Sequence, residues 1–217
     1  MISPGCSFTF DGLKQTLLNI ESGIEKKLKN VQHLLINYRT TKDILALANA
    51  ILGKAREFFP GTIDFAQPEK TRKDLGLKVV LCNWKDAFNS AAKFGENQAF
   101  VYSPVSSEGI AVEAGEWLNN HPFILTSLES KGLEFDDVVV AFDHDRKTWQ
   151  VEQRREISLK MLRELYVAVT RAQKRVVILV KEDVPAMASF FDILNCDLEI
   201  SDARIFEEFN RDTSKEA

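Results

Sequence analysis

Cysteine is scarce in this sequence, and its spacing argues against two kinds of site. The 217 residues contain three cysteines, which are Cys6, Cys82 and Cys196. Their odd number, their wide separation and the lack of any C-x-x-C pair make a disulfide framework and a zinc site unexpected. We therefore expect no metal centre of this kind, and a reducing intracellular compartment, cytoplasmic or nuclear.

Long apolar runs and an excess of positive charge are also missing. No apolar run reaches the length of about 18 residues that suggests a membrane span, so no membrane partner is expected. The opening residues, MISPGCSFTF, lack the charged region and long apolar core of a signal peptide. The 28 Lys and Arg residues face 32 Asp and Glu residues, for a net charge of −4. This balance gives no bulk support for a protein that coats nucleic acid, although it allows a local basic groove.

What the sequence does contain is a regular alternation of short apolar strands with helices. Such alternation requires crossover connections, and it predicts an α/β domain whose mainly parallel sheet is covered by helices on both faces. The runs VVILV and VVVAF predict central strands. The predicted strands are 33–36, 77–82, 99–102, 123–126, 138–142 and 176–180. The predicted helices are 12–29, 84–94, 107–118, 155–171 and 184–194, with another that Pro60-Gly61 ends. We divide the chain into a helical segment (1–30), the main domain (31–198) and a polar tail (199–217).

Polar segments follow two of the predicted strands. Ligands of a parallel sheet bind outside the carboxyl ends of its strands, so Asn37-Tyr38-Arg39 and residues 126–134 are expected at that edge. Arg171 differs, because it ends the helix that enters the last apolar strand. A guanidinium suits phosphate, and the carboxylate of Glu134 could accept a hydrogen bond from a sugar hydroxyl. Gly132 permits a tight turn.

Each segment also has a plain structural interpretation. Arg171 points almost opposite Leu162 on a helical wheel, on the side of Lys160, Glu164 and Val167, and could be a solvated charge at the helix end. Arg39 could belong to a surface pair beside a capped helix, because residues 40–43, Thr-Thr-Lys-Asp, resemble a capping box. The charges around Gly132 could simply be solvated.

Taken in order, three segments resemble motifs of the superfamily 1 helicases of the UvrD/Rep class. The segments are NYRTTKDIL, SKGLEFDDVV and RELYVAVTRAQKRVVIL, which are similar to motifs IV, V and VI of the second RecA-like lobe. Together they span residues 34–180, which is most of the chain. The stretches SPGCSFTFDGLKQTLL and ESKGLEFDDV look closest to one branch, the large UvrD-like proteins with TPR and ankyrin repeats (the lupus-brain-antigen type).

The resemblance implies a three-layer RecA-like fold, as in P-loop NTPases, and a role at ATP bound with Mg²⁺. In that family ATP sits between two lobes, and the second lobe supplies arginines to the γ-phosphate. By motif match, the catalytic residues would be Arg171, as the arginine finger, and Arg39. Tyr38 would stack near the adenine, and Glu134 would contact the ribose. The other implied cofactor-binding positions are Lys131 and Gly132.

The resemblance also implies single-stranded DNA or RNA as a partner. Thr126 and Ser127 would lie toward that strand. The family's motif V usually carries a histidine three residues before its lysine, whereas Leu128 stands there in this chain, followed by Glu129. This departure weakens the expected contact with nucleic acid.

The motifs that hold ATP and Mg²⁺ in the family's first lobe are missing. No G-x-x-x-x-G-K-[ST] occurs, and the Gly-Lys of ILGKAREF lacks the upstream glycine and the following hydroxyl. The acids of EFDDVVV precede their strand instead of ending one. The chain is therefore expected to be the C-terminal half of a motor whose partner is a first RecA-like lobe. Alone it should bind ATP poorly and hydrolyse none.

Two other interpretations stay open. The chain could be a non-catalytic RecA-like scaffold within a larger protein, a possibility favoured by the missing histidine and the acidic pI. It could also be a hydrolase with a metal at Asp143-His144-Asp145, because two carboxylates around a histidine can ligate a metal. His33 and His121 offer no spacing that would complete such a site.

Overall fold

The computed structural model describes residues 10–20, 35–60, 68–76, 79–88, 97–103, 123–142, 155–181 and 198–201. Its strands are β1 (Ile36–Asn37), β2 (Lys70–Thr71), β3 (Val80–Asn83), β4 (Gln98–Tyr102), β5 (Ile124–Thr126), β6 (Phe135–Phe142), β7 (Ala172–Val180) and β8 (Glu199–Ile200). Its helices are α1 (Phe10–Ile20), α2 (Lys42–Phe58), α3 (Trp84–Phe88) and α6 (Arg155–Val169). Among the described helices, none has the length and apolar character needed to cross a bilayer.

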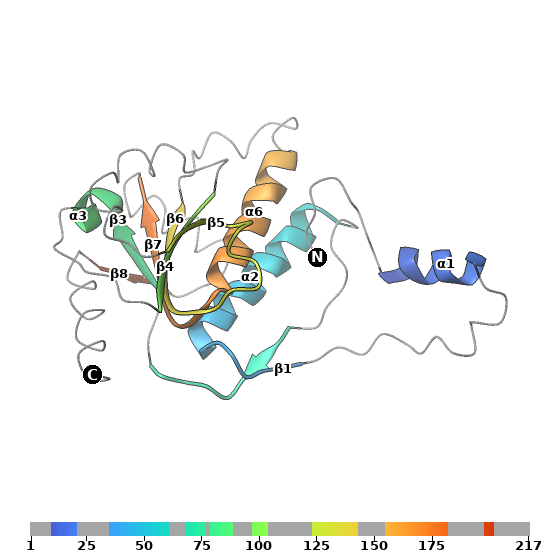
Figure 1. Ribbon diagram of the computed structural model, residues 1–217, viewed down its shortest axis with the longest axis horizontal. Coiled ribbons are helices and arrows are strands. Elements are labelled where there is room, and N and C mark those ends of the chain that lie inside the picture. The colour runs from blue at the N-terminus through green and yellow to red at the C-terminus, as the bar shows by residue number, and fades with distance from the viewer. Residues whose placement is uncertain are drawn as a thin grey trace.

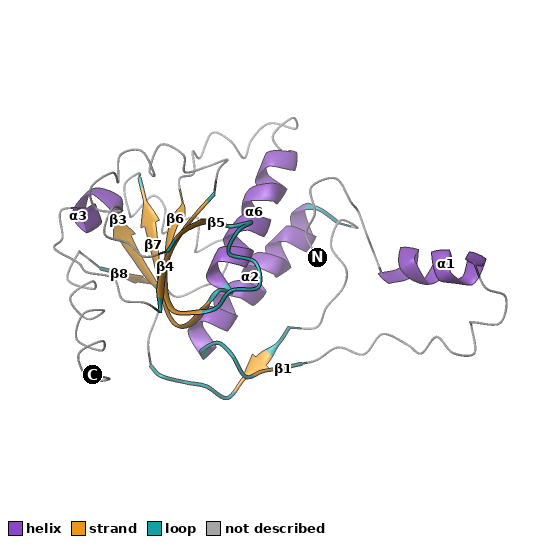
Figure 2. Cartoon of the chain, in the orientation of Figure 1, coloured by secondary structure: helices purple, strands orange, loops and turns teal. Residues whose placement is uncertain are grey.

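A six-stranded sheet in the order β5-β4-β6-β7-β3-β8 forms the middle layer (Figures 1 and 2). Every pairing in this sheet is parallel. The two apolar runs predicted to be central lie in β6 and β7, and these strands pair with each other in the middle of the sheet. The predicted α/β class with a parallel sheet is confirmed, and the arrangement is consistent with a RecA-like domain.

Helices cover both faces of this sheet. One face packs against α2 and α6, whose apolar positions recur at helical spacing and are almost fully buried: Ile44, Leu47 and Ile51 in α2, and Leu162 and Leu165 in α6. Each such side chain contributes about 1.5–3 kcal/mol when it leaves water. The opposite face is apolar too, and Trp84 of α3 packs there. The helices predicted at 107–118 and 184–194 lie outside the described residues.

Both central strands begin earlier than the sequence predicts. β6 starts at Phe135 instead of residue 138, and β7 at Ala172 instead of residue 176. Four of the seven added residues are charged, namely Asp136, Asp137, Lys174 and Arg175, which hides the start of each strand from a search for apolar runs. The charged side chains fit in the sheet because each forms an ion pair with a residue of the other strand. The pair of Arg175 and Asp137 is buried, and the pair of Lys174 and Asp136 is partly exposed.

The strand predicted at 33–36 is not part of the main sheet. The observed β1 pairs with β2 in a separate two-stranded parallel sheet. No strand was predicted at β2, whose two residues, Lys70 and Thr71, are polar. No strand was predicted either at β8, which lies at the start of the expected polar tail and pairs with β3. Of the helix predicted at 12–29, the structure describes the part within α1.

The predicted capping box before α2 is wrong. Thr41 is the N-cap, but its side chain makes no capping hydrogen bond, and its buried hydroxyl has no partner among the described residues. The first amide of the helix, Lys42 N–H, donates instead to the carbonyl of Lys73 at 2.9 Å. Asn37 orders the preceding turn, because its side-chain oxygen accepts from the backbone amides of Arg39 and Thr40 at 2.8 and 3.1 Å.

Candidate functional site

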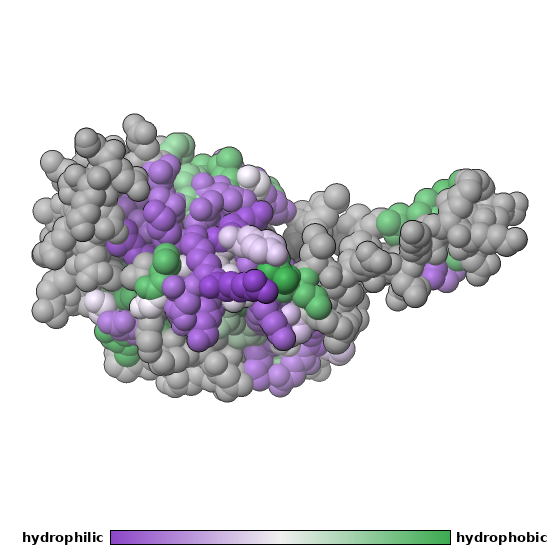
Figure 3. Space-filling model, turned by 90° about the horizontal axis from the view of Figure 1, so that it is seen from below, coloured by the Kyte–Doolittle hydropathy of each residue, from purple (hydrophilic) through white to green (hydrophobic). Residues whose placement is uncertain are grey.

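Arg39, Glu134 and Arg171 meet at the amino ends of β6 and β7. Arg39 Nε lies 2.6 Å from a carboxylate oxygen of Glu134. Arg171 reaches the same turn, because its guanidinium donates to the carbonyl of Leu133, the residue before Glu134. Burial lowers the pKa of Arg171, the positive charge of Arg39 lowers it further, and Glu134 raises it. Arg39 and Glu134 were expected at the carboxyl ends of the strands, and this prediction was wrong. Figure 3 shows the molecule from below, the side toward which these amino ends point in Figure 1, and hydrophilic side chains gather there beside hydrophobic patches.

Arg171 is held on a turn rather than on the helix. Because α6 ends at Val169, the guanidinium folds back over the last turn, where Nε donates to the carbonyl of Val167 at 3.0 Å. Its other nitrogens donate to the carbonyl of Leu133 at 3.3 Å and to the hydroxyl of Thr170 at 3.2 Å. The bond to Val167 caps a carbonyl at the C-terminus of α6, where a positive charge is favoured. The half-buried Arg171 is thus anchored to two of the three motif-bearing segments.

The ion pair between Arg39 and Glu134 is accessible to solvent. The side chains are 47% and 35% exposed, respectively. Ion pairs in such positions contribute about 0.2–1 kcal/mol, because water screens them and two long side chains must be held still. A bound anion could therefore replace Glu134 at the Arg39 guanidinium with little cost to the stability of the domain.

The aromatic side chain beside Arg39 is exposed. Tyr38 is 80% exposed, and Leu133, next to Glu134, is 43% exposed. A second tyrosine, Tyr166 of α6, is partly buried. Burial raises the pKa of its hydroxyl, while Arg171 and Arg39 act in the opposite sense, so it lies near the arginines. No part in the site was predicted for Tyr166.

Two further residues contact the site and were missed. Gln173 donates from its side-chain amide to Glu134 at 2.9 Å. Lys73 donates to the backbone carbonyls of Arg39 and Gln173, at 3.1 Å each. Gln173 lies within the segment that resembles motif VI, but no role was predicted for it, and Lys73 lies outside all three of the segments that resemble helicase motifs.

The turn that leads to Glu134 depends on a glycine. Gly132 has φ +84°, in the left-handed region, and a Cβ there would meet no atom within 4 Å. Lys131 precedes it on the same exposed turn, and the amide of Leu133 donates to the carbonyl of Ser130 at 3.1 Å. The requirement for glycine at this position is therefore one of backbone conformation, not of space.

Replacing Gly132 by Ala is expected to lower the free energy of unfolding by about 1–2 kcal/mol, the cost of the left-handed conformation for a residue with a Cβ. Urea denaturation followed by circular dichroism would measure the change. Gly53→Ala is the matched control, because it lies within α2 and also has no neighbour within 4 Å of a Cβ. That substitution should stabilise the helix. Equal effects at the two glycines would contradict this account of the turn.

Thr126 and Ser127 lie at the opposite edge of the sheet. Thr126 ends β5, whose carboxyl end aligns with the carboxyl ends of β4 and β6. The seven residues 127–133, which begin with hydrogen-bonded turns, connect this edge to Glu134 at the start of β6. The predicted site residues therefore fall into two groups at different ends of the domain.

An acidic side chain occupies the donors of Thr126. Both the backbone amide and the hydroxyl of Thr126 donate to Glu129 Oε2, each at 2.8 Å. These two hydrogen bonds lower the pKa of the Glu129 carboxyl below its ordinary value of 4.5. Because the folded-state pKa is depressed, the stabilising contact is fully present at neutral pH and is lost as the pH falls below that value.

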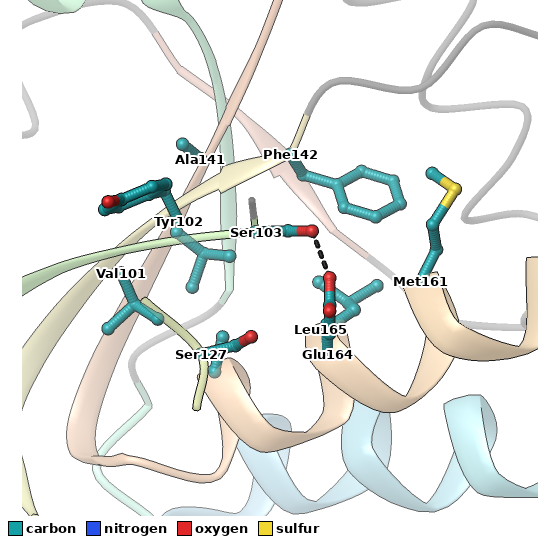
Figure 4. Close-up of a pocket in the computed structure, with 11 residues that line it drawn as sticks. Val101, Tyr102, Ser103, Ser127, Ala141, Phe142, Met161, Glu164 and Leu165 are labelled. Atoms are coloured by element: carbon teal, nitrogen blue, oxygen red, sulfur yellow. Dashed lines mark hydrogen bonds between the residues drawn. The ribbon is translucent and has the colours of Figure 1, made fainter. Parts of the chain in front are cut away.

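A small pocket opens beside Ser127 at this same edge. Ser103 follows β4, and its hydroxyl donates to the carboxylate of Glu164 from α6, as the dashed line in Figure 4 shows. Most of the remaining lining is apolar and comes from β4, β6 and α6. Ser127 is buried, and its amide donates to the carbonyl of Tyr102 at 3.0 Å. Ser127 was among the predicted site residues, whereas the pair of Ser103 and Glu164 was not.

The backbone of the chain is similar to that of solved structures. No family model matches the chain. The chain is similar to the crystal structure of the C-terminal domain of a possible DNA helicase from Lactobacillus plantarum WCFS1, with 16% sequence identity and a TM-score of 0.41. The match covers 76% of this chain and 98% of that chain. At this level the likeness concerns the path of the backbone and not the chemistry of individual residues. The proposed metal loop, residues 143–145, lies outside the described residues.

Proposed function

We propose that the chain is the second motor lobe of an ATP-dependent nucleic-acid helicase or translocase of superfamily 1, within the UvrD-like class. In this proposal ATP and Mg²⁺ are bound mainly by a first RecA-like lobe, and this chain supplies arginines to the phosphates. The supporting observation is that Arg39, Glu134 and Arg171, one from each motif-bearing segment, meet in one exposed patch. Their segments are far apart in the sequence, and the two arginines come close enough for the charge of Arg39 to lower the pKa of Arg171.

The chemistry of the patch suits a phosphate on a neighbouring lobe. In phosphoryl transfer the negative charge spreads over the oxygens of the transferred group, and fixed guanidinium groups stabilise that charge. Arg171 is fixed by its bonds to carbonyls, and Arg39 is held by an ion pair that an anion can replace. The exposed Tyr38 and Leu133 would lie at the interface with the first lobe, where the ring of Tyr38 could stack on the adenine.

Reconstitution with a first lobe tests the proposal. The chain would be joined to, or mixed with, the first RecA-like lobe of a UvrD/Rep-class helicase, which carries the P-loop and the acidic Mg²⁺ motif. ATP hydrolysis would then be measured with and without single-stranded DNA or RNA. We expect turnover from the combination and none from either half alone. Robust hydrolysis by this chain alone would overturn the proposal.

A scaffold without catalysis is the second candidate, and the geometry at Thr126 favours it. In the proposed motor this threonine and Ser127 face the nucleic acid, yet the donors of Thr126 are occupied by a carboxylate. A phosphate would have to displace Glu129 to reach them. A scaffold would show no turnover after reconstitution, and its affinity for nucleic acid would not depend on this loop.

Replacing Glu129 by Gln should therefore raise the affinity for a fluorescent single-stranded oligonucleotide several-fold at neutral pH. The change removes one negative charge that repels phosphate and weakens the bonds that hold Thr126. Fluorescence anisotropy of the reconstituted pair at low salt would measure it. Glu57→Gln is the matched control, because this glutamate near the end of α2 is also exposed and pairs with Lys54. If both variants bind as the original chain does, the loop does not face nucleic acid.

A further inference from the structure

A closed ring of polar contacts joins Arg39 to two residues without a role so far. Arg39 contacts one carboxylate oxygen of Glu134, and the Gln173 side chain donates to the other at 2.9 Å. The Lys73 ammonium closes the ring, because it donates at 3.1 Å both to the carbonyl of Gln173 and to the carbonyl of Arg39. Four segments that are separate in the sequence thus meet in one circuit.

Lys73 belongs to the segment 68–74, here called the strap, which pairs with the turn bearing Arg39 through backbone and side-chain hydrogen bonds. Strand pairing aligns Ile36 with Lys70 and Asn37 with Thr71. The Thr71 hydroxyl donates to the carbonyl of Thr40 at 3.0 Å.

The strap is also hydrogen-bonded to α2. The carbonyl of Lys73 accepts from the first amide of that helix at 2.9 Å. Farther along, the Asn49 side chain donates to the carbonyl of Glu69 at 3.0 Å. The turn of Arg39 therefore lies between the helix and the strap, and Lys73 is the point at which the strap reaches β7.

The ring explains how an exposed arginine can keep one position. An exposed ion pair holds its partners weakly, because both side chains have many conformations in water. Here Gln173 restrains the carboxylate, and Lys73 restrains the backbone from which Arg39 projects. We propose that Lys73 and Gln173 are positioning residues that set the direction of the Arg39 guanidinium. Their consequence for ATP turnover rests on the proposed function, whereas the ring itself is a property of this chain alone.

The first test follows Arg39 in the isolated, ¹⁵N-labelled full chain, through the exchange of its Nε–H with water. Lys73→Met removes the ammonium and keeps an unbranched stem. It should speed the exchange about 10-fold, as expected for the loss of a charge-assisted hydrogen bond in the ring. Lys73→Arg should keep most of the protection. Lys70→Met is the matched control, because this exposed lysine lies on the same strap, and it should change nothing.

A second variant keeps the test decisive if Lys73→Met does not fold. Gln173→Met removes only the amide that restrains Glu134, and it should speed the same exchange. Unchanged Arg39 exchange in a folded Lys73→Met chain, or in Gln173→Met where Lys73→Met is unfolded, would overturn the proposal.

The second test measures ATP turnover of the variants after reconstitution with the first lobe. Lys73→Met should lower kcat by about 10- to 100-fold, the usual cost of misplacing a reacting group, with little change in KM, and Lys73→Arg should recover most of it. A wild-type kcat in Lys73→Met would overturn the positioning role. If the unmodified chain shows no turnover, the proposed function fails, and the exchange of Arg39 Nε–H still decides whether the ring positions this arginine.

Discussion

Replacing Arg171 by Ala is expected to lower ATP turnover of the reconstituted motor by about 10³- to 10⁵-fold, the contribution of an arginine finger in nucleotide hydrolases. The affinity for ATP should fall much less, because the first lobe holds most of the nucleotide. The guanidinium stabilises negative charge that develops in the transition state, and its interaction with the bound substrate is weaker. Its loss therefore lowers kcat more than it weakens the binding of ATP. Steady-state kinetics with and without single-stranded nucleic acid would separate kcat from KM.

The structure calls for two controls in this experiment. Arg171 also caps the carbonyls of Val167 and Leu133, so thermal unfolding must show that Arg171→Ala still folds. Arg171→Lys keeps the charge but loses the planar fork, and most of the turnover should still be lost. Arg72→Ala is the matched substitution at an exposed arginine, and it should turn over normally. Normal turnover by a folded Arg171→Ala chain would remove Arg171 from the mechanism.

Sequence reasoning reached the members of the arginine patch but not their surroundings. Motif order selected Arg39, Glu134 and Arg171, and the structure brings these three together. The helical wheel placed Arg171 on the side of Val167, whose carbonyl it contacts. The wheel did not predict that the guanidinium is half-buried and reaches Leu133, because a wheel does not extend past the end of a helix, and α6 ends at Val169. On the same basis Val167 was placed on an outward face, yet it is buried.

The contacts of Lys73 could not be predicted for a different reason. They depend on β1 and β2, two strands of two residues each, which pair across a long separation in the sequence. So short a pairing leaves no periodic pattern, and its position is set by hydrogen bonds such as that from Asn37 to Glu69 at 2.8 Å. The long apolar strands β6 and β7 were predictable, because burial on both faces demands a continuous apolar run.

The first residues of β6 and β7 are the part of these strands that an apolar run does not predict. Asp137 and Arg175 belong to the sheet although both are charged, since their side chains pair inside it at 2.7 and 2.8 Å. Gln98 extends this polar cluster to a third strand, β4, because its side-chain amide donates to Asp137 at 2.9 Å. The register of three neighbouring strands is therefore marked by one polar cluster at the amino end of the sheet.

Replacing Asp137 by Ala is expected to lower the free energy of unfolding by about 3–5 kcal/mol, as for other buried ion pairs that lose one partner. The Arg175 side chain is 9% exposed and would lose this counter-ion in a place where water cannot take over. Gln98 would lose its acceptor as well. Urea denaturation, with intrinsic tryptophan fluorescence and circular dichroism compared, would measure the change and show whether unfolding stays two-state.

The neighbouring ion pair supplies the matched control, because it joins the same two strands and differs mainly in burial. Lys174 Nζ lies 3.1 Å from a carboxylate oxygen of Asp136, and these side chains are 40% and 27% exposed. Asp136→Ala should therefore cost no more than about 1 kcal/mol. Asp137→Leu combined with Arg175→Met should recover much of the loss, since an apolar pair of similar volume avoids the desolvation of both charges. Equal losses for Asp136→Ala and Asp137→Ala would show that burial does not determine the strength of these pairs.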